Sequence, residues 1–330
     1  MHSFEVEEIK KSGQDFALDI AVLANRGSDC FSHIGMAREI AVITNAKLQT
    51  PTSKSVSSPK IQAKKFVSVQ VNDKIACPRY TAKVMVDIKV GPSPKWLQDR
   101  LAVCGLNSIN NVVDVANYVM LETGQPMHAF DGEKLAHPSS GRVPEIIVRR
   151  GQKGEKITTL DGQKFDLNPD ILVIADQESP IAIAGIKGGV LPEISQETKT
   201  VILESANFSR MLIRQGSRAL GLRTDASLRF EHGLDPNATE FAVERAAYLI
   251  QRIAGGQVAK GSIDIYPKKF YPKRIKLDLN YAASLLGVKI PLTTIKSILK
   301  NLGFILREVK PQSILVEAPT RRLDVSIPED

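Results

Sequence analysis

The stretch 110–131, NNVVDVANYVMLETGQPMHAFD, constrains the fold more than any other part of the chain. Its apolar segment 112–121 predicts a buried helix, and the Gly-Gln-Pro sequence at 124–126 predicts the turn that ends it. Asp114 and Asn117 lie inside the apolar segment. A buried amide or carboxylate costs about 1–3 kcal/mol unless it is hydrogen-bonded. These two side chains therefore need partners, either structural or functional.

His128 follows the turn, and two interpretations of this region remain open. In the first, the segment is a packed helix, Asn117 bonds a neighbouring loop, and His128 is a satisfied, partly buried imidazole. In the second, the polar side chains belong to a functional site.

The rest of the chain mixes clustered strands and helices without a regular βαβ pattern, which predicts an α+β fold with more than one domain. Strands are expected at 16–23, in FVSVQV, YTAKVMVDIKV, ILVIAD and PIAIAGI, in a hairpin around Asp161-Gly162, and at 314–317. Helices are expected from Ser28-Asp29 to Thr44, at 96–105, at 209–220, after Asp235-Pro236, and at 280–286 and 292–302. Segments 49–64 and 257–273 have the composition of linkers.

Composition narrows the class of protein. The 330 residues are 43% hydrophobic, enough for a substantial core, and carry a net charge of +8. No apolar run approaches the ~20 residues of a membrane helix, so a cytoplasmic protein without membrane contact is expected. Cys30, Cys77 and Cys104 are far apart, which predicts buried reduced thiols rather than a zinc site.

Basic residues gather in the predicted helix 209–220 and just after it. Arg210, Arg214 and Arg218 recur every fourth residue, and Arg223 follows, so the four can form one basic stripe. Such a stripe permits a polyanionic partner, because Lys and Arg release counterions from a phosphate backbone.

No GxSxG, HExxH, P-loop or Rossmann glycine pattern is present, so a hydrolytic enzyme of this sequence would use water as its nucleophile. His128 and Glu204, which ends the apolar strand VILE, are the candidates to orient or activate that water. Glu204 is equally explained as a salt-bridge or capping partner.

The segment 110–131 resembles the editing domain of the bacterial-type phenylalanyl-tRNA synthetase β subunit. Four further blocks resemble that family in order and spacing: LDIAVLANRGSDCFSHIGMAREIAVIT, PIAIAGIKGG, VILESANFSRMLIRQGSRALGLRTDASLRFEHGLDP and APTRRLDVSIPED. The resemblance covers nearly the whole chain. It implies the end of an N-terminal core domain at 1–48, a linker at 49–65, a mixed-sheet tRNA-editing domain at 66–270, and a small, C-terminally truncated helical or winged-type α+β module at 271–330.

The resemblance also implies an activity, the hydrolysis of tyrosine wrongly esterified to tRNA(Phe). The implied catalytic residues are His128, Asn117 and Thr224, although Thr224 is also explained as a helix cap. Glu204 would recognise the tyrosine hydroxyl, with Gly188 and Ala226 leaving room for the ring and Ala184 completing the pocket. An editing site is needed because an apolar pocket rejects an added hydroxyl only about 10²-fold.

The remaining implications concern the whole synthetase. Asp324 and Asp330 match two magnesium-binding positions of the family, although an acidic loop beside a strand explains them as well. The family expects tRNA(Phe) and an α subunit as partners, in a heterotetramer, with ATP used only by the holoenzyme.

Two departures from the family favour an alternative function. Asn107 in GLNSIN stands where many members have arginine, and Ala116 stands where they have threonine. The alternative is a non-enzymatic module that binds tRNA or docks on the α subunit, with editing lost.

Overall fold

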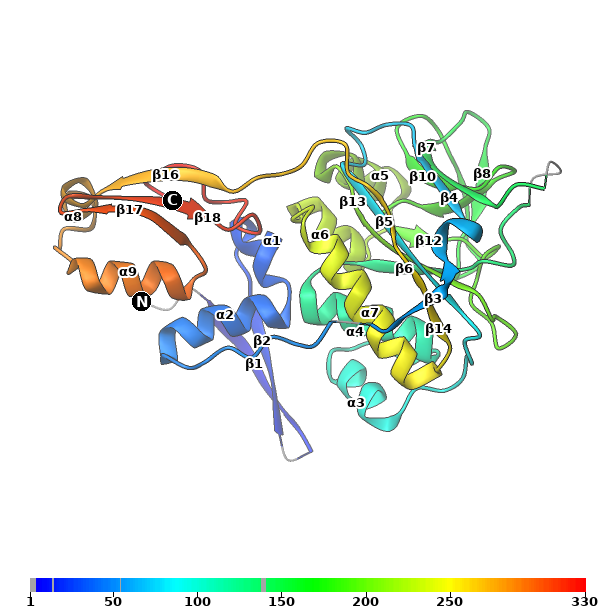
Figure 1. Cartoon of the computed structure of the whole chain (residues 1–330), viewed down its shortest axis with the longest axis horizontal. Helices are drawn as coiled ribbons and strands as arrows, with labels where there is room; N and C mark the ends of the chain where they lie inside the picture. The colour runs from blue at the N-terminus through cyan, green and yellow to red at the C-terminus, as the bar shows by residue number, and fades with distance from the viewer. Residues whose placement is uncertain (1–3, 14, 54, 138–140) are drawn as a thin grey trace.

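A computed structural model describes residues 4–13, 15–53, 55–137 and 141–330, and its secondary structure is α+β, as predicted (Figure 1). The chain has a small N-terminal unit, a large central part with two sheets, and a small C-terminal module. The domain boundaries set out above stay predictions.

The N-terminal unit is an antiparallel hairpin followed by short helices. Its elements are β1 (Glu5–Ser12), β2 (Asp15–Ala21), η1 (Ala24–Arg26), α1 (Gly27–Cys30) and α2 (His33–Thr44). The prediction of one helix up to Thr44 was wrong, because the chain breaks at Phe31 and Ser32 and begins a second helix. Ser32 is the N-cap of α2, and its hydroxyl accepts a hydrogen bond from the Gly35 N–H.

The central part contains two sheets that face one another across a hydrophobic core. The six-stranded sheet has the order β3 (Ser57–Gln62), β14 (Gln257–Lys260), β5 (Arg79–Val86), β13 (Val201–Asn207), β6 (Met127–Asp131), with β15 (Ile263–Ile265) also paired to β5. The five-stranded sheet has the order β12 (Lys187–Gly188), β11 (Pro180–Ile183), β10 (Leu172–Ala175), β7 (Glu145–Arg150), β4 (Ser68–Val71). A separate hairpin joins β8 (Lys156–Thr158) to β9 (Lys164–Asp166).

Two predicted linkers contain strands and a helical turn. Part of the first forms β3 and η2 (Ala63–Lys65), and part of the second forms β14 and β15. Composition favoured a linker because Pro59 and several serines interrupt any periodicity. The structure accommodates Pro59 because β3 is an edge strand, where a missing N–H donor is tolerated.

Helices cover the other face of the six-stranded sheet. The central part contains α3 (Lys95–Val103), α4 (Asn111–Thr123), α5 (Arg210–Leu220), α6 (Asp225–His232) and α7 (Ala238–Ala254). Of these, α3, α4 and α7 contribute Leu97, Val115 and Ala246 to a core shared with the strand residues Met85 and Leu203. The predicted helix in 112–121 is α4, and Gly124 at φ 82° ends it.

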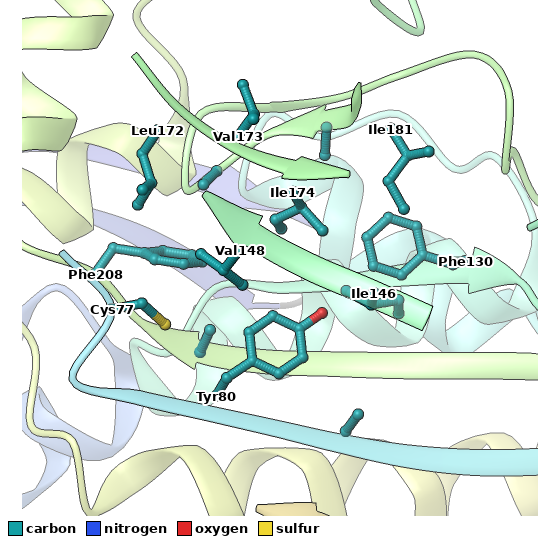
Figure 2. Close-up of a cluster of buried hydrophobic side chains, with 14 of the residues drawn as sticks. Cys77, Tyr80, Phe130, Ile146, Val148, Leu172, Val173, Ile174, Ile181 and Phe208 are labelled. Atoms are coloured by element: carbon teal, nitrogen blue, oxygen red, sulfur yellow. The ribbon is translucent and has the colours of Figure 1, made fainter. Parts of the chain in front are cut away.

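The core between the two sheets holds large apolar side chains from both (Figure 2). Phe130 comes from the six-stranded sheet, and Ile146, Ile174 and Ile181 come from the five-stranded sheet. Tyr80 of β5 also lies in this core, with its hydroxyl buried and without a hydrogen-bond partner among the described residues.

The C-terminal module is a three-stranded antiparallel sheet with two helices. Its elements are β16 (Lys273–Asp278), α8 (Leu279–Leu286), α9 (Leu292–Asn301), β17 (Ile305–Lys310) and β18 (Ser313–Ala318), with sheet order β16-β18-β17. The sequence predicted both helices and β18 but missed β16 and β17. Helix α2 contacts both α4 and α9, so the N-terminal unit lies between the other two parts (Figure 1).

Two predictions from composition can be compared with the structure. Cys30 and Cys77 are buried as expected, but the prediction for Cys104 was wrong, because it follows the end of α3 and is exposed. Among the described residues, none of the helices has the length and apolar character needed to cross a membrane.

Candidate functional site

Strands β6 and β13 place His128 and Glu204 directly opposite each other in antiparallel register. The same register pairs Phe130 with Ile202, two residues along each strand. Because side chains alternate across a strand, all four point to the same face of the sheet. Phe130 and Ile202 belong to the core between the sheets, so His128 and Glu204 also face the space between them.

Glu204 is a buried carboxyl group with an unused acceptor. The residue is 5% exposed, and its Oε2 has no hydrogen-bond partner among the described residues. Burial raises the pKa of the Glu204 carboxyl to about 8. At neutral pH the Glu204 carboxyl is therefore mostly the uncharged acid.

His128 lies in tight contact with its surroundings. Its ring packs edge-on against Phe130, with ring centroids 4.6 Å apart and an interplanar angle of 74°. A Cβ added at Gly188 would lie 2.4 Å from Cε1 of His128, closer than any real contact allows. Burial lowers the pKa of His128 to about 4, so the imidazole is neutral at pH 7.

A cavity of about 80 Å³ opens between these two side chains and the five-stranded sheet. That volume can hold several water molecules, because a cavity needs only about 10–15 Å³ to hold one. Four predicted site residues line it: His128, Gly188, Glu204 and Ala226. The structure thus brings together residues from four separate elements, β6, β12, β13 and α6.

The other lining residues are mostly apolar and were not singled out from the sequence. They are Pro126, Met127, Ile174, Ala182, Ile183, Gly185, Ile186, Lys187, Phe208 and Phe230. Of these residues, Gly185 is the one whose residue type the structure requires most clearly. Its φ is +67°, and an added Cβ would lie 2.9 Å from the Ile213 side chain.

Thr224 supports the cavity from outside it. Its hydroxyl donates to the Ile186 carbonyl over 2.9 Å and accepts from the Ser227 N–H over 3.1 Å. Thr224 is the N-cap of α6 and forms a capping box there. Ala226 lies in the first turn of the same helix. The hydroxyl is therefore already engaged in holding the cavity wall.

Ala184 and Asn117 do not line the cavity. Ala184 is fully buried beside the lining residue Ile183, and its N–H donates to the Leu172 carbonyl. Asn117 is half-buried on α4, which packs on the opposite face of the six-stranded sheet. Asp114 has hydrogen-bond partners of the kind expected, since its carboxylate accepts from the Ser93 hydroxyl and the Ile109 N–H.

Asp324 and Asp330 have other partners than a metal. Both Asp324 oxygens accept hydrogen bonds from the Arg322 guanidinium, at 2.8 and 2.9 Å. Oδ2 of Asp330 accepts from the backbone N–H groups of Ser326 and Ile327, and these bonds hold the pKa of that carboxyl below its usual range. As arranged here, the two carboxylates do not fit a magnesium ion, which needs several unengaged oxygen ligands.

One other group of potential ligand atoms occurs within the described ranges. Asp29, Cys30 and Glu39 lie close together, but the Arg26 guanidinium donates to all three. A cation already occupies the centre of that cluster, so it does not fit a metal ion.

Comparisons with known proteins give the family. Residues 76–255, more than half of the chain, match the B3/4 domain, and residues 275–330 match the tRNA synthetase B5 domain. The chain is 44% identical over 319 residues to a phenylalanine–tRNA ligase beta subunit of Carboxydothermus hydrogenoformans, covering 96% of this chain and 38% of that protein. It is 41% identical over 313 residues to the protein of the same name in Clostridium acetobutylicum, covering 95% and 38%.

The chain spans about two fifths of the length of these curated relatives. Among solved structures, it is similar to an N-terminal fragment of the phenylalanyl-tRNA synthetase beta-subunit from Pyrococcus horikoshii. That pair has a TM-score of 0.47 and 14% identity, over 98% of this chain and 87% of the other.

Proposed function

This chain belongs to the B3/4 domain family, and from that membership we propose that it is the editing region of a phenylalanine–tRNA ligase β subunit. In this proposal the region hydrolyses tyrosine that has been esterified to tRNA(Phe) by mistake. Aminoacylation with ATP belongs to the assembled ligase, which includes an α subunit. The cytoplasmic location stays a prediction.

The observation that carries the proposal is the Glu204 carboxyl, which has a buried oxygen without a partner among the described residues and lines a mostly apolar cavity. A tyrosine ring entering between the sheets meets apolar walls, and its hydroxyl gives Glu204 the partner that it lacks. Phenylalanine has no ring hydroxyl, so its binding would leave the same Glu204 oxygen buried without a partner. Leaving a buried polar group unpaired costs about 1–3 kcal/mol, which favours the tyrosyl ester.

The ester is cleaved by water. A water oxygen bonds to the ester carbonyl carbon, the bond from that carbon to the ribose oxygen breaks, and the products are free tyrosine and a tRNA hydroxyl. His128 is neutral at pH 7, so one ring nitrogen accepts a hydrogen bond and orients this water. Thr224 acts as a positioning residue, because its hydroxyl fixes Ile186 in the cavity wall.

The arginine stripe suits a tRNA backbone. Arg210, Arg214, Arg218 and Arg223 are all exposed, on and just after α5. The opposite side of α5 buries Ile213, whose side chain lies against Gly185 at the cavity. An RNA bound along this stripe would therefore lie beside the editing cavity. Contacts to its phosphates would position the RNA without reading its base sequence.

Asp324 and Asp330 take no part in the proposed hydrolysis. Both carboxylates are engaged with protein donors, so no step of the proposed hydrolysis passes through a metal.

A second function, a tRNA-binding or α-subunit-docking module without hydrolysis, has support from two positions. Asn107 is exposed and cannot supply the bidentate contact of an arginine, and Ala116 brings no hydroxyl. Asn117 also lies outside the cavity lining.

Hydrolysis of tyrosyl-tRNA(Phe) and phenylalanyl-tRNA(Phe) by the purified chain separates the two functions. We expect the tyrosyl ester to be cleaved faster, with the preference lost in Glu204→Ala and kept in Glu178→Gln, a control at an exposed carboxylate. Salt-sensitive tRNA binding with background hydrolysis of both esters would instead establish the binding module.

A further inference from the structure

A second cavity, of about 200 Å³, lies where the three parts of the chain meet. Its walls come from α1 and α2, from the turn after α4, from the start of α7, and from Thr320 and Arg321 of the C-terminal module. Hydrogen bonds join these walls, since the Ser28 hydroxyl donates to the Arg321 carbonyl and the Thr320 hydroxyl donates to Asp235. The cavity is thus enclosed by segments held together around it.

Two guanidinium groups line this cavity without a carboxylate partner. Arg38 makes no hydrogen bond or ion pair with any part of the chain that the structure describes, and Arg321 donates to the Leu302 carbonyl over 2.5 Å. Burial lowers the pKa of both arginines, and the charge of Arg38 lowers that of Arg321 further. Two cations therefore line one partly desolvated cavity, an arrangement that favours an anion beside them.

The carboxylates that border the cavity are already engaged. Asp29 accepts two hydrogen bonds from Arg26, at 2.9 and 3.1 Å. Asp235 accepts from the Thr320 hydroxyl over 2.6 Å and from the Asn237 N–H over 2.9 Å. Neither forms an ion pair with Arg38 or Arg321 in the described structure, although both carboxylates lie near enough for their charges to raise the pKa of Arg321.

Gln125 also lines this cavity and carries an acceptor without a partner in the described part of the chain. The residue is 1% exposed, and its amide nitrogen donates to the carbonyls of Pro126 and Ala206. These two bonds fix which end of the amide is nitrogen, and the oxygen, Oε1, has no partner among the residues described. A ligand with a hydroxyl beside its negative charge satisfies this oxygen.

We propose that this cavity binds a protonated phosphate, either hydrogen phosphate or the phosphate group of a small molecule, between Arg38 and Arg321. The phosphate oxygens accept hydrogen bonds from the guanidinium groups, which match oxyanion geometry. A hydroxyl of the ligand donates to Oε1 of Gln125. This site is separate from the editing cavity. Gln125 lines the phosphate site, whereas its neighbour Pro126 lines the editing cavity.

Titration calorimetry at constant ionic strength in chloride tests the site, with inorganic phosphate, glycerol phosphate and sulfate as probes. We expect binding of one or both phosphates, and at least tenfold weaker binding of sulfate, which has no proton to donate at neutral pH. Binding of inorganic phosphate identifies the free ion as sufficient, whereas binding of glycerol phosphate alone identifies an ester. Equal binding of sulfate and phosphate, or binding of neither phosphate, would overturn the proposal.

Arg38→Gln gives the decisive variant, with Arg252→Gln as a matched control at an exposed arginine on α7. In phosphate-free buffer Arg38→Gln should melt near the temperature of the parent, because it removes no hydrogen bond or ion pair of the described structure. It should also weaken phosphate binding at least tenfold, while the control leaves binding unchanged. A lower melting temperature with unchanged phosphate affinity would show that Arg38 has a purely structural role and would refute the site.

Discussion

Replacing Glu204 with glutamine should change how stability depends on pH. The Glu204 carboxyl has an ordinary pKa of 4.5 in the unfolded chain and about 8 in the folded protein, because burial disfavours its charge. Between these two values the folded state holds a proton that the unfolded state has released. Stability is therefore full below pH 4.5 and falls as the pH rises toward 8.

The size of the effect follows from the two pKa values. Each pKa unit is worth about 1.4 kcal/mol, so the wild-type protein should lose about 3–4 kcal/mol of unfolding free energy between pH 5 and 8 through this group alone. Glutamine has nearly the same shape but does not ionise, so Glu204→Gln should lack this loss. Any cost of its unpaired amide is the same at every pH.

Urea unfolding of the wild-type chain and of Glu204→Gln at several pH values between 5 and 8 measures the difference directly. His128 titrates in the opposite sense, since its lowered pKa makes stability rise with pH up to about 6.5. Both proteins carry His128, so its contribution cancels in the difference. The exposed-site variant Glu178→Gln should follow the wild type. A difference between wild type and Glu204→Gln that stays flat across this range would refute the argument, because Glu204 would then be ionised and compensated in the folded state.

Three further predictions concern the walls of the cavity and the N-terminal unit. Gly188→Ala should lower stability by about 1–3 kcal/mol in urea unfolding and slow deacylation in single-turnover assays, because its Cβ would overlap His128. Thr224→Ala should lower stability by about 1 kcal/mol through the lost cap, and Thr224→Ser should restore it. Arg26→Met should cost about 3–5 kcal/mol by leaving Asp29, which is buried, and Glu39, which is partly buried, without the Arg26 cation, measurable by urea unfolding. Unchanged stability in any of these variants would contradict the contact that it tests.

Local signals in the sequence predicted local structure well. Helix α4 could be placed because its apolar segment is long and Gly124 supplies the left-handed residue that ends it. Strands β16 and β17 were missed because both are largely exposed, so no run of buried residues marks them. The break at Ser32 was missed because the apolar pattern continues through it.

The candidate site could be predicted only in part. Residue type alone made His128 and Glu204 candidates, but they lie far apart in the sequence, and their pairing depends on a strand register that one sequence does not give. Thr224 could be recognised as a possible cap from the sequence LRTDAS, while its bond to Ile186 depends on tertiary structure. The side of the sheet on which Asn117 lies follows from how α4 packs, which periodicity does not determine.

The register of β13 explains why the fold can hold an uncompensated carboxyl group. Ile202 and Glu204 face the core between the sheets, whereas Val201 and Leu203 face the helices, so a shift by one residue would exchange the two sets. Strand β13 pairs with β5 over residues 201–207 and with β6 over residues 201–205, which resists such a shift. The free energy of unfolding of an ordinary domain is about 5–15 kcal/mol, so a group that lowers it by about 3–4 kcal/mol by pH 8 removes a large share. A ligand hydroxyl that pairs with Glu204 would recover part of that free energy, and under the proposed editing function this recovery favours a substrate that carries a hydroxyl.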